Sequence, residues 1–251
     1  MITVQIASDL HIEHNSNDIP NIADYIIPES EVLILAGDIG SLYKLDQLRG
    51  FLERLSTLFQ AILYIPGNHE FYMRHGYQPI SYKALETRLE SLGNSISNLY
   101  ILNRRSVRIN DVCIAGCTLW SNPKCTVPPF IVRVNGFNTA AYSKQHKKDL
   151  KYIKKMISYC KKEKCKLVIV THHPPSYRAL DGAKKRKRFE SLYASNLDHL
   201  LNGDDVKVWI CGHTHKNIDF LTNNGCRVVT NQKGKVKDRV TDYVKSLKIL
   251  L

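Results

Sequence analysis

The chain has 251 residues, of which 43% are hydrophobic and 24% charged, and its formal net charge is +13. This length suits one α/β domain over residues 1–251, and the absence of a long apolar run excludes a membrane-spanning helix. The positive charge favours acidic partners, such as phosphorylated substrates or nucleic acid.

The N-terminus and the cysteines bear on the compartment. The residues before Asp9 lack the basic start of a signal peptide, so we expect none. Seven cysteines are scattered along the chain without a CxxC pair. That usage is typical of reduced, structural thiols in a reducing compartment. We therefore expect a cytoplasmic protein.

Two strands with polar ends open the chain. Residues 2–7 alternate and then become apolar, which predicts a strand that ends at Asp9 and His11. Strand side chains two apart point the same way, so these two polar groups share one side. Residues 31–36 are an almost unbroken apolar run, typical of a central parallel strand, and Asp38 follows them between two glycines. One such carboxylate has two oxygens and can bridge two cations.

A helix, a strand and a second helix follow. Apolar residues at helical spacing predict helices over residues 45–59 and about 81–92. Between them, residues 62–65 predict a buried strand that ends at Asn68 and His69. Further strands are expected over residues 98–102, 107–109 and 112–115. This order predicts a mixed sheet, and the run of adjacent strands indicates two stacked sheets.

A loop and a long helix begin the second half of the chain. The prolines between residues 120 and 138 predict a surface loop. Residues 138–162 then predict a helix with one apolar face and one lysine-rich face. We expect the lysine-rich face to be solvated, because runs of like charge are common on exposed faces.

Two further buried strands end in histidines. Residues 166–171 and 206–211 are apolar runs of the same kind as residues 31–36. The histidines at their ends are His172, His173, His213 and His215. Beyond them, a hairpin is expected over residues 217–231 and a final strand over residues 243–250.

Five strand ends therefore carry Asp, Asn or His, and six of the ten histidines lie there. A single histidine at a strand end is more often an ordinary polar residue than a ligand. Five coincident strand ends point instead to a metal or catalytic site. Nitrogen and oxygen donors without a cysteine favour Mn²⁺, Fe, Zn²⁺ or Co²⁺. The number of donors suits two ions about 3.5–4 Å apart that share a carboxylate and clamp a phosphoryl group.

The order of these motifs resembles the calcineurin-like metallophosphoesterase superfamily. The motifs are Asp-x-His, Gly-Asp, Gly-Asn-His-Glu, His-His-x-Pro and Gly-His-x-His, and they lie between Asp9 and His215. The resemblance implies an α/β fold, a four-layer α/β/β/α sandwich of two mixed sheets with a dinuclear metal site at the strand ends.

The resemblance also implies a role for each motif residue. One ion would be held by Asp9, His11, Asp38 and His215. The other would be held by Asp38, Asn68, His172 and His213, with Asp38 bridging both. His172 is chosen over His173 because the first histidine of that motif is the usual ligand. Catalytic His69 would protonate the leaving oxygen or stabilise the developing charge. The ions are expected to be divalent or trivalent, with manganese preferred over Fe, Zn or Co. A metal-bound hydroxide would attack phosphorus in line.

Two departures separate the chain from the Ser/Thr protein phosphatases of this superfamily. Those enzymes carry an arginine where this chain has Pro66, and a longer motif where Asp38 is followed by Ile-Gly-Ser. The chain resembles instead the smaller microbial and viral phosphoesterases, so we expect hydrolysis of phosphodiesters or nucleotides. The alternatives are a Ser/Thr protein phosphatase and a catalytically silent binding scaffold on the same fold. The scaffold predicts missing ligands, and every expected position is filled.

A run of five cations, residues 184–188, follows the His172 motif. Five cations near the strand end could attract a polyanionic substrate, such as a nucleotide or nucleic acid. A solvated loop and a nuclear-localisation signal are the alternatives.

Overall fold

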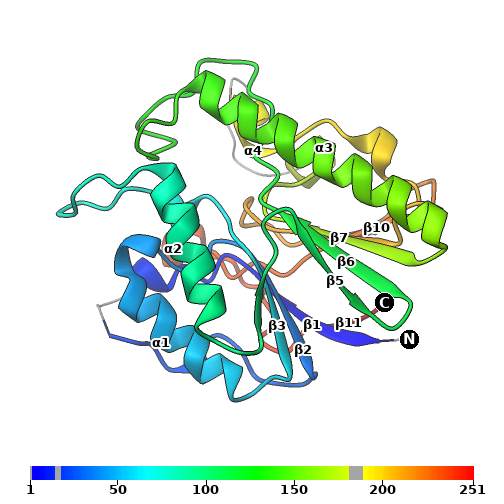
Figure 1. Ribbon diagram of the computed structural model, residues 1–251, viewed down its shortest axis with the longest axis horizontal. Coiled ribbons are helices and arrows are strands. Elements are labelled where there is room, and N and C mark those ends of the chain that lie inside the picture. Colours follow the sequence, from blue (N-terminus) through cyan, green and yellow to red (C-terminus); the bar gives the residue numbers. More distant parts are fainter. Residues whose placement is uncertain (1, 15–17, 181–188) are drawn as a thin grey trace.

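The computed structural model describes residues 2–14, 18–180 and 189–251, and its strands form two sheets (Figure 1). The first sheet contains, in spatial order, β11 (Lys248–Leu250), β1 (Thr3–Ala7), β2 (Val32–Ala36), β3 (Ala61–Ile65) and β4 (Leu99–Ile101). The second contains, in spatial order, β5 (Arg105–Ile109), β6 (Val112–Cys117), β7 (Lys166–Thr171), β8 (Val208–Cys211), β10 (Arg227–Thr230) and β9 (Asp219–Leu221). Both sheets are mixed, because β11, β5 and β9 run antiparallel to their neighbours at the edges.

Helices cover the outer faces of both sheets. The described helices are α1 (Leu45–Ser56), α2 (Tyr82–Asn94), α3 (Thr139–Glu163) and the short α4 (Glu190–Tyr193). Figure 1 shows α1 and α2 on the side of the first sheet and α3 along β6 and β7. Two helix starts are capped by side chains: Ser81 accepts a hydrogen bond from the Ala84 amide, and Asn138 accepts one from the Ala141 amide.

The core consists of three apolar layers that follow the period of two in the strands. Leu33 and Leu35 of β2 pack with α1 and α2, whereas Ile34 faces the second sheet and packs with Val168 of β7. On the far side of the second sheet, Ile169 packs under α3. Helices, sheet, sheet and helix therefore form four layers, and the predicted α/β/β/α sandwich of two mixed sheets is confirmed.

The connection over residues 120–138 contains no helix or strand, as the loop prediction expects, but part of it is buried. Its aliphatic and aromatic side chains are buried in the same core layer as α1 and α2: Val127, Val132, Val134 and Phe137. Phe130 alone among its large apolar residues is 75% exposed. Prolines disfavour a regular helix or strand in this segment. Burial of its apolar side chains still stabilises the fold, because that stabilisation does not require regular secondary structure.

The final strand is also shorter than expected. Only Lys248–Leu250 pairs with β1, and residues 243–247 lie outside any strand. The side chain of Asn231 satisfies the backbone of Val244 from both sides, with its amide donating at 2.7 Å and its oxygen accepting at 3.0 Å. A side-chain partner thus replaces the ladder that the alternating pattern predicts.

The lysine-rich face of α3 is exposed, as the sequence predicts, along Lys147, Lys148, Lys151, Lys154 and Lys155. Within the described residues, no helix combines the length and apolarity that crossing a membrane requires. The basic run at residues 184–188 lies outside the described residues.

Candidate metal centre

The ends of five parallel strands meet at one edge of the sandwich. The turns after β1, β2 and β3 supply residues from the first sheet, and those after β7 and β8 supply residues from the second. Several of these residues have a left-handed backbone: Asp9, His11, Asp38, His213 and His215, with φ between 50° and 73°. Such strain in non-glycine residues clusters at functional sites, where surrounding contacts hold it in place.

A first group of ligand atoms comes from Asp9, His11, Asp38 and His215, and its atoms all lie within 4.8 Å of one another. The Nε2 atom of His215 lies 3.0 Å from Nε2 of His11 and 3.2 Å from Oδ1 of Asp9. Oδ2 of Asp38 lies 3.8 Å from the same nitrogen of His11. These are the four residues that the resemblance groups around one ion.

A second group comes from Asp38, His172 and His213. The Nε2 atom of His172 lies 3.3 Å from Oδ1 of Asp38 and 3.2 Å from Nδ1 of His213. Asn68 joins this group, because its Oδ1 lies 2.9 Å from the same Nε2 atom. Asp38 thus presents one oxygen to each group, which is the arrangement of a bridging carboxylate. Metal binding by these seven residues stays a prediction.

The hydrogen bonds around the first group test whether a cation fits. The Nδ1 atom of His11 lies 3.2 Å from Glu13, and Nδ1 of His215 lies 2.6 Å from Asp238. Each carboxylate accepts the Nδ1 hydrogen, so in the neutral rings the two Nε2 lone pairs face each other. Two lone pairs 3.0 Å apart repel unless a positive charge lies with them. Carboxylate–histidine pairs of this kind orient histidine ligands in metal sites.

The pKa shifts of the candidate ligands also indicate that the two groups attract positive charge. Burial lowers the pKa of His215, but Asp238 and Asp9 outweigh it and raise that pKa to about 9. Burial likewise lowers the pKa of His172, and Asp38 raises it to about 9. Burial raises the pKa of Asp38, yet His172 and His69 hold it well below its usual range. Both groups therefore attract positive charge, and their nitrogen and oxygen donors fit borderline or hard metal ions.

His172 and His173 have different surroundings. His172 gives its Nδ1 hydrogen to the Ala36 carbonyl at 2.9 Å, which leaves Nε2 for the ligand group. The ring nitrogens of His173 lie instead 3.3 Å from the Thr118 carbonyl and 3.4 Å from the Tyr142 hydroxyl. Burial and the adjacent His172 lower the pKa of His173 to about 3. These contacts favour His172 as the ligand.

His69 lies beside the two groups without belonging to either. Its amide donates to Oδ1 of Asp38 at 2.7 Å, and its ring lines a cavity of about 240 Å³ that the candidate ligands also border. Burial lowers the pKa of the ring. On one side Nδ1 lies 3.2 Å from Oε1 of Glu13, and on the other Nε2 lies 3.1 Å from Nζ of Lys235. The ring of the predicted catalytic histidine therefore lies between the carboxylate of Glu13 and the ammonium of Lys235.

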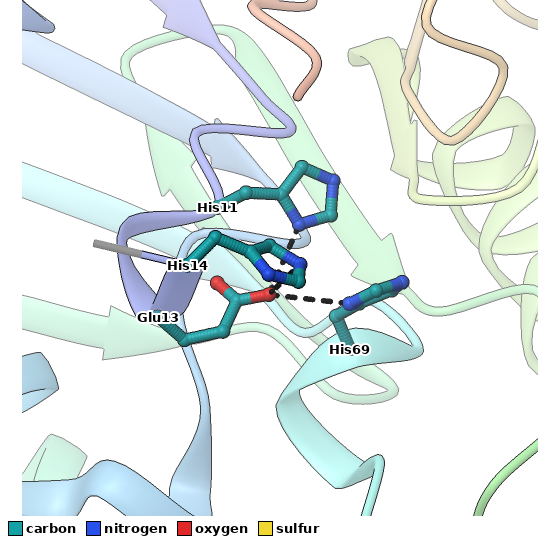
Figure 2. Close-up of side chains that lie close together, drawn as sticks. All are labelled: His11, Glu13, His14 and His69. Carbon is teal, nitrogen blue, oxygen red and sulfur yellow. Dashed lines mark hydrogen bonds and ion pairs between the residues drawn. The ribbon is translucent and has the colours of Figure 1, made fainter. Parts of the chain in front are cut away.

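Glu13 lies at the centre of this site, although it belongs to none of the motifs in the sequence. Figure 2 shows its carboxylate among three imidazole rings, and its Oε1 lies 3.2 Å from Nδ1 of both His11 and His69 and 3.3 Å from Nε2 of His14. Its side chain is fully buried. Burial raises the pKa of Glu13, but hydrogen bonds from His11 and His69 lower it well below the usual range. The one available signal was a carboxylate two residues after a predicted ligand.

His11, Glu13, His14 and His69 are close enough together to hold an ion of their own. Their hydrogen bonds argue for another role, because a nitrogen that donates to Glu13 cannot also be a ligand. Burial lowers the pKa of His14 to about 4, and the positive charges of Lys235 and Arg74 act in the same direction while Glu13 opposes them. We interpret Glu13 as the residue that orients the rings of His11 and His69.

Glu70, the last residue of the Gly-Asn-His-Glu motif, has a structural role. Its carboxylate accepts hydrogen bonds from the Gly67, Asp38 and Ile39 amides and from the Tyr64 hydroxyl, at 2.7–3.0 Å. Burial and the charge of Asp38 raise its pKa to about 8, although the hydrogen bonds from Tyr64 and Ile39 lower it. Glu70 thereby ties the turn after β2 to the turn after β3, which sets Asp38 beside Asn68.

Comparisons with known proteins place the chain in a family. A family model described as calcineurin-like phosphoesterase matches residues 2–217. The uncharacterized protein L509 of Acanthamoeba polyphaga mimivirus is 24% identical over 266 residues, which cover 95% of this chain and 93% of that protein.

Two solved structures share the fold. Phosphopantetheinyl hydrolase (PptH) of Mycobacterium tuberculosis matches with a TM-score of 0.78 at 18% identity, over 99% of this chain and 95% of its own. A dimetal phosphatase of Danio rerio matches with a TM-score of 0.56 at 14% identity, over 91% of this chain and 86% of its own. Since the family match spans most of the sequence, the chain belongs to the calcineurin-like phosphoesterase family of metal-dependent phosphoester hydrolases.

Proposed function

We propose that this hydrolase acts on phosphodiesters or nucleotides. It would use two metal ions, preferably manganese, that are bound by the seven predicted ligand residues. The observation that carries the proposal is the position of Asp38, which offers one carboxylate oxygen to each ligand group. Two bound ions would supply the Lewis acidity that activates water and draws charge from the phosphoryl group. A mononuclear centre would leave one complete set of donors unused.

The chain's own residues would do the rest of the chemistry. His69 reaches the cavity with Nε2, where a leaving oxygen needs a proton or a hydrogen bond. Glu13 would hold the ring of His69 in place through Nδ1. Asn68 would orient phosphoryl oxygen at the second ligand group, since its side chain also borders the cavity.

Two observations weigh against the other candidates. A catalytically silent scaffold would not need a buried acid aligned on both His11 and His69. A Ser/Thr protein phosphatase of this superfamily would carry an arginine at the position of Pro66. We therefore favour a phosphodiester substrate, and the name of the mycobacterial relative adds a phosphopantetheinyl ester to the substrates worth testing.

A substrate screen tests the proposal. Mn²⁺-loaded protein would be assayed with bis-p-nitrophenyl phosphate, p-nitrophenyl phosphate, cyclic nucleotides and a phosphopantetheinyl ester. Asp38→Ala protein purified in parallel controls for contaminating hydrolases. We expect the highest kcat/KM on a diester. Hydrolysis confined to monoesters or phosphoproteins would overturn the diester preference, and equal activity of the control would overturn the site.

A further inference from the structure

Lys235 faces the candidate metal centre from a loop that the motifs do not include. It follows β10 in the chain and borders the same cavity as Asp38 and His69. Its ammonium lies 3.1 Å from Nε2 of His69, the atom that the proposed reaction uses. A cation is therefore placed at the side of the cavity where a leaving oxygen would lie.

The loop of Lys235 is fixed to the candidate ligands by its backbone. The Lys235 amide donates to Oδ2 of Asp238 at 3.0 Å, and the same oxygen accepts from Nδ1 of His215 at 2.6 Å. One residue earlier, the Gly234 amide donates to the Asp9 carbonyl at 3.0 Å. The position of Lys235 relative to the centre is thus set by two predicted ligands.

The ammonium of Lys235 lies near the carboxylates of Asp38, Glu13 and Asp238 but forms no ion pair with them among the described residues. The side chain is half-buried, yet no carboxylate oxygen lies within ion-pair distance of its Nζ atom in that part of the chain. Burial lowers its pKa, because an ammonium loses its water shell, and the carboxylates of Asp38, Glu13 and Asp238 offset only part of that cost. An anion in the cavity would offset that cost.

The lining of the cavity also includes an apolar and aromatic wall. It is formed by Ile131 and Val132 of the connection between β6 and α3 and by Leu192 and Tyr193 of α4. The volume of about 240 Å³ is small for a ligand pocket. It suits one phosphate and the first atoms of an ester group, with any remainder of the substrate outside.

We propose that Lys235 is a substrate-binding residue whose ammonium holds a phosphoryl oxygen beside His69 while the ester group packs on the apolar wall. This inference rests on the proposed function. The expected substrate is a phosphate ester whose phosphate end enters the cavity first and whose adjacent portion is apolar. The competing interpretation is that Lys235 only positions the ring of His69.

Binding of inorganic phosphate tests the inference without turnover. Calorimetry on metal-loaded protein would compare wild type with Lys235→Met, Lys235→Arg and the control Lys233→Met. Lys233 belongs to the same loop, but its ammonium lies over the Tyr25 ring, 4.8 Å from the ring centroid. A charge-assisted hydrogen bond predicts about 10- to 100-fold weaker phosphate binding in Lys235→Met. Lys235→Arg should recover most of the affinity, and the control should match wild type.

A double-mutant cycle separates direct binding from positioning. Lys235→Met would be measured alone and in a His69→Ala background, with metal content and unfolding recorded for each variant. Direct binding predicts that phosphate affinity falls by a similar factor in both backgrounds. Loss of the effect in the His69→Ala background would overturn the inference and leave Lys235 as a positioning residue.

The outcome also separates this inference from the proposed function. If no phosphate ester is hydrolysed but Lys235→Met weakens phosphate binding, the proposed function fails and the anion site stands. If esters are hydrolysed and phosphate affinity, KM and kcat are the same in Lys235→Met as in wild type, the proposed function stands and Lys235 is not a substrate-binding residue.

Discussion

The Oε1 atom of Glu13 lies 3.2 Å from Nδ1 of His69, and both side chains are buried. The same oxygen lies 3.2 Å from Nδ1 of His11. Glu13→Gln should therefore lower both metal affinity and kcat, each by about 10- to 100-fold, because a carboxylamide holds imidazole rings less firmly. Metal titration and steady-state kinetics measure the two effects. Glu53→Gln, on the exposed face of α1, is the matched control. Unchanged kcat and metal affinity in Glu13→Gln would contradict the orienting role.

Asp38→Ala should abolish hydrolysis and lose most of the bound metal. The reason is that Asp38 faces His11 with one oxygen and His172 with the other, so one substitution weakens both groups. Elemental analysis of purified protein measures the metal content. Two ions retained per chain in this variant would rule out the bridging role.

His69→Ala should keep its metal and lower kcat by about 10²–10⁴, the usual contribution of a positioned acid–base group. The loss should be smaller for p-nitrophenyl esters than for alkyl esters, because a good leaving group needs little protonation. Kinetics on a matched pair of esters tests this. Equal losses on both would argue for charge stabilisation in place of proton donation.

Gly37 tests how tightly the turn after β2 packs on the site. It has φ of 87°, and a Cβ atom there would overlap the ring of His172. Gly76 has a similar φ of 83° but has no heavy atom within 4 Å of the same position. Gly37→Ala should therefore lose metal affinity, whereas Gly76→Ala should show only the cost of backbone strain. Metal titration and thermal unfolding of the pair would show this, and equal effects would mean that the contact with His172 is unimportant.

His146 gives the native state a pH dependence that is separate from the metal centre. It is buried on α3 with Nδ1 2.6 Å from the Trp120 carbonyl, and burial lowers its pKa from 6.5. The neutral ring is favoured in the folded state, so its stabilisation is complete above pH 6.5 and declines as pH falls below that value. The free energy of unfolding of wild type should fall relative to His146→Gln by at most about 1.4 kcal/mol per pH unit there. A difference that does not vary with pH would contradict the burial of a neutral ring.

The strand ends could be predicted because buried parallel strands are apolar runs with sharp polar ends. Each of the predicted ligands lies within four residues after such a run, as Asp38 does after β2 and His213 after β8. Their φ values and the role of Glu70 could not be predicted. The role of Glu70 depends on contacts between two turns that are about thirty residues apart.

The residues that act on the ligands were harder to find. Lys235 is 166 positions from His69 in the sequence. It does not follow a buried apolar run with a polar end, which is the pattern that identified the predicted ligands. Asp238 likewise reaches His215 from 23 residues away. Both lie on a loop whose path follows from the backbone contacts of Gly234 with Asp9. The pattern of residues in a single strand or helix does not predict that a distant loop packs against the ligands.

A stepwise metal titration tests the central claim most directly. Chelator-treated protein would receive Mn²⁺ in fractions of an equivalent while bound metal and hydrolysis of bis-p-nitrophenyl phosphate are followed in the same sample. The two ligand groups joined by Asp38 predict that hydrolysis rises with the two-ion form and reaches its maximum at two ions per chain. Full activity at one ion per chain, or two bound ions without hydrolysis of any phosphate ester, would contradict the account.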